Sequence, residues 1–284
     1  MMIRRHVLMA AAAAIAATGL SLGGAAAQGK KVKIAYVEWS DAVVATTILK
    51  TVLESKGYDV TITPLPAAAM WQAVATGEAD AMVAAWLPAT HESYYKQLKD
   101  KVDLIGPNVT GAKIGWAVPK YTEISSIEDL KTKASLVDGK VIGIDPGAGL
   151  MKASDKAIKE YGLPVKLVDG SDATMTAALK DAYDRKQNIV VTTWTPHWMF
   201  ARWDLKYLAD PKNVFGGEET VNTVARKDLK KDNPELHAIL SKFKLSLEDE
   251  QKVMVWNEEK GAKPAETAAR WVKENPDKVK AWLQ

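Results

Sequence analysis

The sequence predicts an α/β protein made of two lobes with a cleft between them. Strand and helix patterns alternate through the first half of the chain, and a second strand–helix series begins at residue 141. From about Asn233 onward the pattern is helical. We therefore expect a discontinuous first lobe, residues 30–115 plus 223–284, and a second lobe, residues 116–222. Two chain crossings predict a hinge, and ligands of open α/β sheets lie at the carboxyl ends of the strands.

The first series consists of short apolar strands separated by helices. Asp41 is a candidate N-cap for the first helix, whose apolar side chains recur at helical spacing until Gly57 ends it. The second helix covers residues 67–76 and stops at Gly77, because glycine favours the end of a helix. The strand patterns of this series cover residues 32–37, 60–63 and 81–85.

A strand over residues 113–118, which ends at Pro119, comes before the second series. The run Ser125–Glu128 has the spacing of a capping box and predicts the start of a helix. The stretch 221–225 is a candidate strand that carries the chain back to the first lobe. The other strand patterns cover residues 141–144, 165–168 and 189–193, and helical patterns cover residues 150–161 and 171–185.

Residues 1–27 have the features of a secretory signal peptide. A basic start at residues 4–6 precedes an apolar run over residues 7–22 that is short for a membrane span, and residues 25–27 offer a small-residue cleavage site. An uncleaved anchor and export by the twin-arginine route are the alternatives. The chain has no cysteine, so lipid attachment after this segment and disulfides are excluded. We expect a free protein in the periplasm of a Gram-negative bacterium.

Composition argues against several classes of function. Lys and Arg total 38 and Asp and Glu total 35, and two of the basic residues lie in the expected signal peptide, so the mature protein is nearly neutral. Because there is no basic stripe, nucleic acid is not an expected partner. We also expect the protein to be a monomer. No His or Cys cluster has metal-ligand spacing, so neither a metal nor another cofactor is expected. No catalytic residue is expected: His91–Tyr95 lacks the second His of a zinc protease, and a hydrolase-like pattern at 19–23 lies in the signal.

The chain has ten tryptophans against three phenylalanines, an unusual ratio. Trp39, Trp86 and Trp194 each stand in a short polar turn at an expected strand end. A trimethylammonium group has no N–H to donate, so aromatic faces suit it better than hydrogen-bond acceptors. Trp is the best aromatic partner for a cation, and each contact contributes about 0.5–2 kcal/mol. The three indoles predict a cage for a methylated ammonium ligand, and packing in the core is the alternative for each of them.

A carboxylate site would complete the pocket for a betaine. The turn over residues 145–150 is rich in glycine and starts a helix, where free backbone N–H groups bind anions. The amides of Gly149 and Leu150 are the candidates, and a plain helix start is the alternative. His91, five residues after Trp86, could donate to the same carboxylate. Its alternative is a capping or surface residue.

Five motifs resemble the glycine betaine-binding proteins of ABC transporters. Together they are specific, and the resemblance extends over nearly the whole mature chain. The motifs are YVEW (36–39), AWLPATH (85–91), IGIDPGAGLM (142–151), VVTTWTPHWMF (190–200) and DLKYLADP (204–211).

This resemblance implies a two-lobed clamshell of the type II periplasmic binding protein class, with ABC permease subunits in the inner membrane as partners. It also implies that a prism of three Trp holds the quaternary ammonium, and that a His and two backbone amides hold the carboxylate. By position these residues are Trp39, Trp86, Trp194, His91, Gly149 and Leu150. Leu150 stands where relatives often carry Ile, which leaves a backbone contact unchanged.

We therefore expect a periplasmic binding protein that captures glycine betaine, or a close analogue such as proline betaine or dimethylsulfoniopropionate, for ABC-transporter uptake. A binding protein that prefers choline or dimethylsulfoniopropionate is the alternative within this class. A periplasmic enzyme acting on a quaternary amine is the alternative from another class. Such an enzyme would need a nucleophile or a metal near the cage, and the sequence offers no candidate for either.

Overall fold

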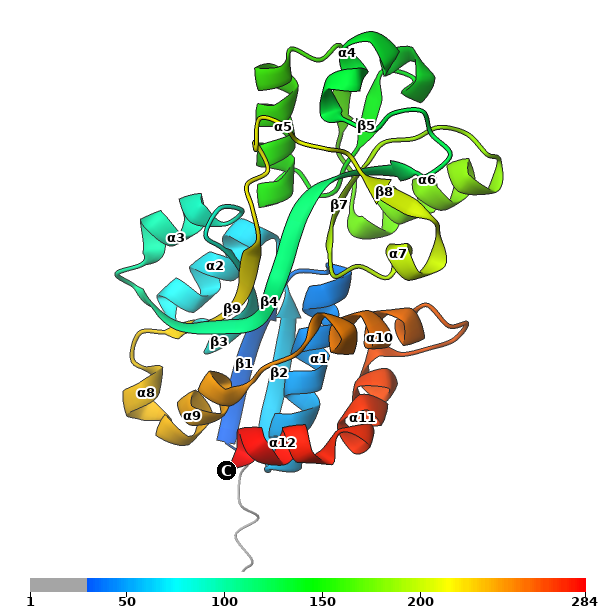
Figure 1. Cartoon of the computed structure of the whole chain (residues 1–284). Coiled ribbons are helices and arrows are strands. Elements are labelled where there is room, and N and C mark those ends of the chain that lie inside the picture. Colours follow the sequence, from blue (N-terminus) through cyan, green and yellow to red (C-terminus); the bar gives the residue numbers. More distant parts are fainter. Residues whose placement is uncertain (1–29) are drawn as a thin grey trace, which may run out of the picture.

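The computed structural model describes residues 30–284, so the expected signal peptide over residues 1–27 lies outside the described part. A curled mixed sheet of nine strands runs through the molecule with helices packed around it (Figure 1). The α/β class expected from the alternating patterns is confirmed.

The strands form one continuous sheet with both parallel and antiparallel pairs. They are β1 (Lys30–Tyr36), β2 (Tyr58–Pro64), β3 (Ala81–Leu87), β4 (Val102–Pro119), β5 (Lys140–Ile142), β6 (Lys166–Val168), β7 (Val191–Thr195), β8 (Leu205–Tyr207) and β9 (Glu219–Arg226). Their order is β2-β1-β3-β9-β4-β7-β5-β6, and β8 pairs with β4. The strand β1 is parallel to β2 and β3, and β5 is parallel to β6 and β7. In contrast, β9 runs antiparallel to β3 and β4.

Helices connect most of the strands and make up the C-terminal region. The longer ones are α1 (Ser40–Ser55), α2 (Ala67–Thr76), α3 (Glu92–Leu98), α5 (Gly149–Tyr161), α6 (Asp172–Asp184), α9 (Pro234–Lys242), α10 (Leu247–Asn257), α11 (Pro264–Glu274) and α12 (Pro276–Leu283). The short ones are α4 (Leu130–Lys133), α7 (Met199–Arg202), α8 (Leu229–Asp232) and the 3₁₀ turns η1 (Ile127–Asp129) and η2 (Ala134–Val137). Within residues 30–284, none of these helices combines the length and the apolar character that crossing a bilayer requires.

The long strand β4 links two parts of the sheet. Its residues 102–112 pair with β9, and its residues 113–119 pair with β7 and β8. Figure 1 shows β4 and β9 side by side between a lower part built on β1–β3 and an upper part built on β5–β8. The C-terminal helices return to the lower part, where α10 and α11 pack against α1. We propose that the two parts are lobes, residues 30–115 plus 223–284 and residues 116–222, which move about the β4–β9 pair.

Two local features differ from what the sequence predicts. Asp41 does not cap α1: Trp39 is at the N-cap, no side chain caps it, and the Asp41 carboxylate instead accepts a hydrogen bond from a distant indole. The capping box is formed by Ser126 and Asp129 rather than by Ser125–Glu128. Both registers place an acidic residue three positions after a serine, so the sequence alone does not distinguish them.

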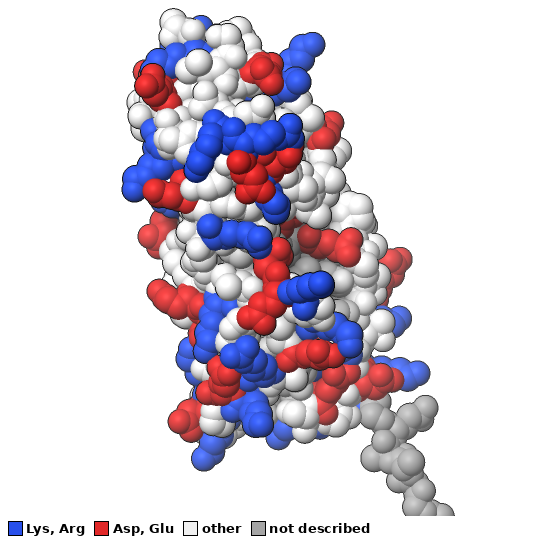
Figure 2. Space-filling view, turned by 90° about the vertical axis from the view of Figure 1, so that its right-hand side faces the viewer, with Lys and Arg blue, Asp and Glu red and all other residues white. Residues whose placement is uncertain are grey.

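An apolar interior rich in tryptophan stabilises the fold. Trp71, Trp116 and Trp271 are completely buried. On the face seen in Figure 2, acidic and basic side chains are interspersed without a large area of one sign. Exposed ion pairs contribute only about 0–1 kcal/mol each, whereas a buried large apolar side chain contributes about 1.5–3 kcal/mol. Apolar burial is therefore the main source of stability in a chain without disulfides.

Candidate functional site

Three tryptophans meet at one small cavity between the two parts of the sheet. Trp39 follows β1, Trp86 is in β3 and Trp194 is in β7, and they are only 7, 2 and 3% exposed. The cavity is narrow, with a volume of about 20 Å³, and its lining surface is apolar. An apolar lining of this kind suits the methyl-covered surface of a small ligand. The complete lining is Trp39, Trp86, Thr90, Ile114, Ile144, Ala148, Leu150 and Trp194.

The structure brings four of the six predicted site residues to this cavity, namely the three tryptophans and Leu150. The other two lie next to it. Gly149 stands between the lining residues Ala148 and Leu150, and the ring centroid of His91 is 5.8 Å from that of Trp39. Each of the three tryptophans is also part of the hydrophobic core. Core packing and cavity lining, the two interpretations that the sequence left open, are therefore compatible here.

His91 has a buried ring whose two nitrogens have different surroundings. Its Nδ1 accepts a hydrogen bond from the backbone N–H of Trp86 at 3.1 Å and from the indole Nε1–H of Trp71 at 3.3 Å. Since Nδ1 is an acceptor, the neutral ring carries its proton on Nε2. Nε2 is buried and has no hydrogen-bond partner among the described residues. His91 is fully buried, so it is not a surface residue, and it stands at the N-cap of α3 without a side-chain capping bond.

Burial, and to a lesser extent the positive charge of Lys152, together lower the pKa of His91 to about 3. An unfolded His has a pKa near 6.5, so between about pH 3 and 6.5 the unfolded chain binds a proton that the folded chain does not. The contribution of His91 to stability is therefore complete above about pH 6.5 and is lost as the pH falls toward 3. We expect the imidazole NMR signals of His91, assigned with His91→Asn, to show no titration between pH 5 and 8. A midpoint near 6.5 would contradict this.

The turn before α5 presents backbone donors beside the cavity. The helix begins at Gly149, and its N-cap residue Ala148 provides no side-chain cap. Neither the N–H of Gly149 nor that of Leu150 has a hydrogen-bond acceptor among the described residues. Such free N–H groups at a helix start, together with the helix dipole, favour an anion. Among the described residues, three donors next to the cavity thus have no acceptor: these two amides and the His91 Nε2–H.

Gly149 has a further structural role that sequence analysis missed. A Cβ atom at this position would lie 2.0 Å from the backbone oxygen of Thr90 and 2.6 Å from its Cγ2. Thr90 belongs to the segment after β3, in the other part of the sheet. Its N–H and that of Ala89 each donate to Glu219 at 2.9 Å, which fixes this segment. Glycine at 149 therefore allows the two parts to approach each other, and not only a ligand to approach the backbone.

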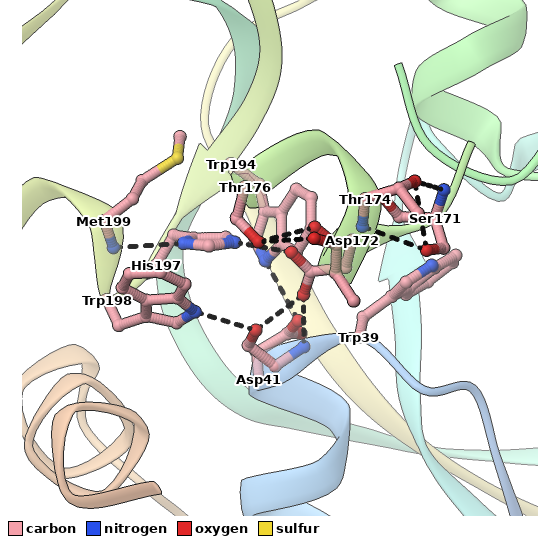
Figure 3. A network of polar contacts seen from close by, with 12 residues as sticks. Trp39, Asp41, Ser171, Asp172, Thr174, Thr176, Trp194, His197, Trp198 and Met199 are labelled. Carbon is pink, nitrogen blue, oxygen red and sulfur yellow. Dashed lines mark hydrogen bonds and ion pairs between the residues drawn. The ribbon is translucent and has the colours of Figure 1, made fainter. Parts of the chain in front are cut away.

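Two of the cavity tryptophans bridge the two parts of the sheet through their indole N–H groups. Trp39 donates to Asp145 Oδ1 at 2.8 Å. Trp194 donates to Asp41 Oδ1 at 2.9 Å, as Figure 3 shows. Each pair joins an indole from one part to a carboxylate from the other. In contrast, the Nε1–H of Trp86 is buried and has no partner within residues 30–284. The two bridges hold the indole rings in place and hold the parts together.

A second polar cluster lies beside the Trp194–Asp41 bridge. Asp172 Oδ2 accepts hydrogen bonds from the backbone N and the hydroxyl of Ser40, at 2.9 and 2.5 Å. Asp172 Oδ1 is 3.1 Å from His197 Nε2, and His197 Nδ1 accepts from the N–H of Met199 (Figure 3). Because Nδ1 accepts a hydrogen bond, Nε2 carries a proton and donates it to Asp172. Trp198 donates to the Ser40 hydroxyl at 3.2 Å, so this cluster also joins the two parts.

The electrostatics of the two aspartates differ although both are buried. Burial, together with the nearby charge of Asp172, raises the pKa of Asp41 to about 6. For Asp172, burial acts in the same upward direction, but the charge and hydrogen bond of His197 and the bonds from Ser40 hold its pKa below the usual value. Sequence analysis missed both aspartates as contacts of the site. The one local signal was the spacing Trp39-Ser40-Asp41, which places a carboxylate two residues after a cavity indole.

Comparison with known proteins gives a family match over most of the chain. The family model described as the substrate binding domain of the ABC-type glycine betaine transport system matches residues 30–274. A curated relative, the glycine betaine/carnitine transport binding protein GbuC of Listeria monocytogenes, is 43% identical over 164 residues, which are 57% of this chain and 54% of that protein. The match to this relative thus spans about half of its length.

Solved structures agree with this match. Lactococcal OpuAC, in its closed-liganded conformation complexed with glycine betaine, is 43% identical, with a TM-score of 0.86, 90% of this chain covered and 100% of that chain covered. An ABC-transporter choline binding protein in complex with choline is 26% identical, with a TM-score of 0.83, 89% of this chain covered and 91% of that chain covered. The fold is therefore that of the type II periplasmic binding proteins, as the sequence motifs imply.

Proposed function

Since the chain belongs to the family of substrate-binding domains of ABC-type glycine betaine transport systems, we propose that it captures glycine betaine or a close analogue and delivers it to permease subunits. The transport role follows from the family. The identity of the ligand and the residues that hold it are argued from the cavity.

The observation that carries the proposal is that three indoles from both parts of the sheet line one apolar cavity. In this proposal Trp39, Trp86 and Trp194 surround the trimethylammonium group of the ligand. Each cation–π contact contributes about 0.5–2 kcal/mol, so three contacts supply a substantial share of the roughly 8 kcal/mol of a micromolar binder. The carboxylates that accept hydrogen bonds from Trp39 and Trp194 add negative charge at the N–H edge of these two indoles. This arrangement favours a cation over a neutral ligand of the same shape.

The ligand carboxylate would accept hydrogen bonds from the three free donors at the other end of the cavity. These are the Nε2–H of His91 and the backbone N–H groups of Gly149 and Leu150. All three donors are neutral, so they match the carboxylate by hydrogen bonds and by the helix dipole. Because His91 comes from one part of the sheet and the two amides come from the other, binding at this end would favour closure of the cleft.

Choline is the second candidate ligand, and the similar fold of a choline binding protein favours considering it. Choline has the same cationic head but no carboxylate. Its hydroxyl could not satisfy three buried donors at once, and each unsatisfied buried donor costs about 1–3 kcal/mol. We therefore propose a preference for glycine betaine over choline. Dimethylsulfoniopropionate remains an alternative ligand, because it carries both a methylated cation and a carboxylate.

The test is calorimetric titration of the purified protein. We expect one glycine betaine molecule to bind per chain. Choline should bind at least about tenfold more weakly, since the loss of one hydrogen-bond partner already corresponds to about that factor. The absence of heat and of a thermal shift with millimolar glycine betaine would refute the proposal. Tighter binding of choline would favour the second candidate. Disappearance of the ligand's mass during incubation would instead indicate an enzyme.

We further propose that the chain acts in the periplasm as a free monomer, after cleavage of residues 1–27. The support comes from the sequence of that segment, with its basic start, apolar run and small residues. Proposed partners are the ligand and the permease subunits in the inner membrane. Intact-mass measurement of protein from a periplasmic extract would determine where the mature chain begins.

A further inference from the structure

We propose that Trp71 is a positioning residue that fixes the tautomer of His91, so that its Nε2–H is always available to the ligand carboxylate. This inference rests on the proposed function for the role of His91, and adds a residue that does not touch the ligand. Trp71 lies in α2, is completely buried and does not line the cavity. On the sequence alone, core packing is its default role.

The contacts of the His91 ring make one tautomer far more favourable than the other. Two N–H groups, the indole of Trp71 and the amide of Trp86, both point at Nδ1. A proton on Nδ1 would face both donors and break both hydrogen bonds, leaving buried donors unsatisfied. It would also turn Nε2 into an acceptor, and a carboxylate has no proton to donate to it. Trp71, together with the amide of Trp86, therefore turns a ring that could be a donor or an acceptor into a dedicated donor.

The indole of Trp71 is held in the position that this role requires. Its ring plane is nearly perpendicular to that of His91, at 85°, with the centroids 6.0 Å apart. It stacks on Tyr94 with the centroids 6.5 Å apart and contacts Tyr95. The Tyr94 hydroxyl in turn donates to the backbone oxygen of Gly147 at 2.6 Å, in the turn before α5. The same aromatic cluster thus sets the His91 donor and contacts the turn that carries the two amide donors.

The amide of Trp86 cannot be removed by substitution, so Trp71 is the member of the pair that can be tested. Trp71→Phe keeps an aromatic ring in the buried site and removes the N–H. The matched control is Trp116→Phe, which removes an equally buried indole whose N–H donates to Ser154 and not to His91. Both variants lose packing, but only the first changes the hydrogen bonding of His91.

The test has two readouts, the imidazole ¹⁵N shifts of His91 and the Kd for glycine betaine, and both must change in Trp71→Phe. In the unliganded wild type, ¹⁵N NMR of the imidazole should find a protonated Nε2 and a bare Nδ1. In Trp71→Phe, the two ¹⁵N shifts should move toward each other as the tautomers mix, and the Kd for glycine betaine should rise about tenfold, the factor expected for one lost hydrogen bond. Trp116→Phe should leave the His91 shifts unchanged and the Kd within about twofold.

An unchanged Kd or unchanged ¹⁵N shifts in Trp71→Phe would overturn the inference. If this variant does not fold, the wild type still decides, because a proton on Nδ1 would contradict the assignment directly. Failure of the wild type to bind glycine betaine would refute the proposed function instead. In that case the ¹⁵N shifts of unliganded Trp71→Phe still decide whether Trp71 sets the tautomer.

Discussion

Replacing Trp194 with alanine should weaken glycine betaine binding by about 100-fold, which corresponds to about 2.8 kcal/mol. Two losses combine. One face of the cage disappears, which removes a cation–π contact of about 0.5–2 kcal/mol and part of the apolar surface around the methyl groups. In addition, the buried carboxylate of Asp41 loses the indole N–H that it accepts at 2.9 Å, and an unsatisfied buried polar group costs about 1–3 kcal/mol.

A second substitution separates these two losses. Trp194→Phe keeps an aromatic face but has no N–H, so its affinity should fall between those of the wild type and Trp194→Ala. Trp256→Ala is the control, because it removes a buried indole of α10 that does not line the cavity, and it should alter stability more than affinity. The measurement is calorimetric titration at fixed pH and salt. An unchanged Kd in Trp194→Ala would remove this residue from the proposed cage.

Replacing Gly149 with alanine should reduce the affinity for glycine betaine at least about 100-fold. A 100-fold loss corresponds to about 2.8 kcal/mol of binding free energy. The new Cβ would lie 2.0 Å from the Thr90 backbone oxygen, and a backbone held by Glu219 cannot easily move away. The closed arrangement would be blocked. Alanine keeps the backbone N–H of residue 149, so the loss would come from impaired closure and not from a missing donor.

Gly147→Ala is the matched control for this substitution. It lies two residues earlier in the same turn, and a Cβ there would meet nothing within 4 Å. Its affinity should stay close to that of the wild type. Small-angle scattering with saturating ligand should find the compact form for Gly147→Ala and a more extended form for Gly149→Ala. If Gly149→Ala closes and binds normally, the close approach of Thr90 does not restrict this position.

Local patterns predicted most helices because periodicity, N-caps and glycine stops are encoded within a few residues. The helix over residues 67–76 has the predicted bounds. The strand β4 was predicted only over residues 113–118, and it in fact extends over Val102–Pro119. The part of β4 before residue 113 contains Gly106, Pro107 and Gly111, which interrupt the alternation of a strand. The shifts in register along its pairing with β9 accommodate these residues, and only the neighbouring strand makes that possible.

The sequence by itself determined the α/β alternation and the positions of Trp39, Trp86 and Trp194 at strand ends, because those signals depend on neighbours along the chain. Only the tertiary structure decided which groups hold the indoles in place. The bridges from Trp39 to Asp145 and from Trp194 to Asp41 join residues 106 and 153 positions apart. It also decided the tautomer of His91, through an indole 20 positions away, and the need for glycine at residue 149. Contacts of this kind form only when the chain folds, and no local pattern in a single sequence records which side chains will meet.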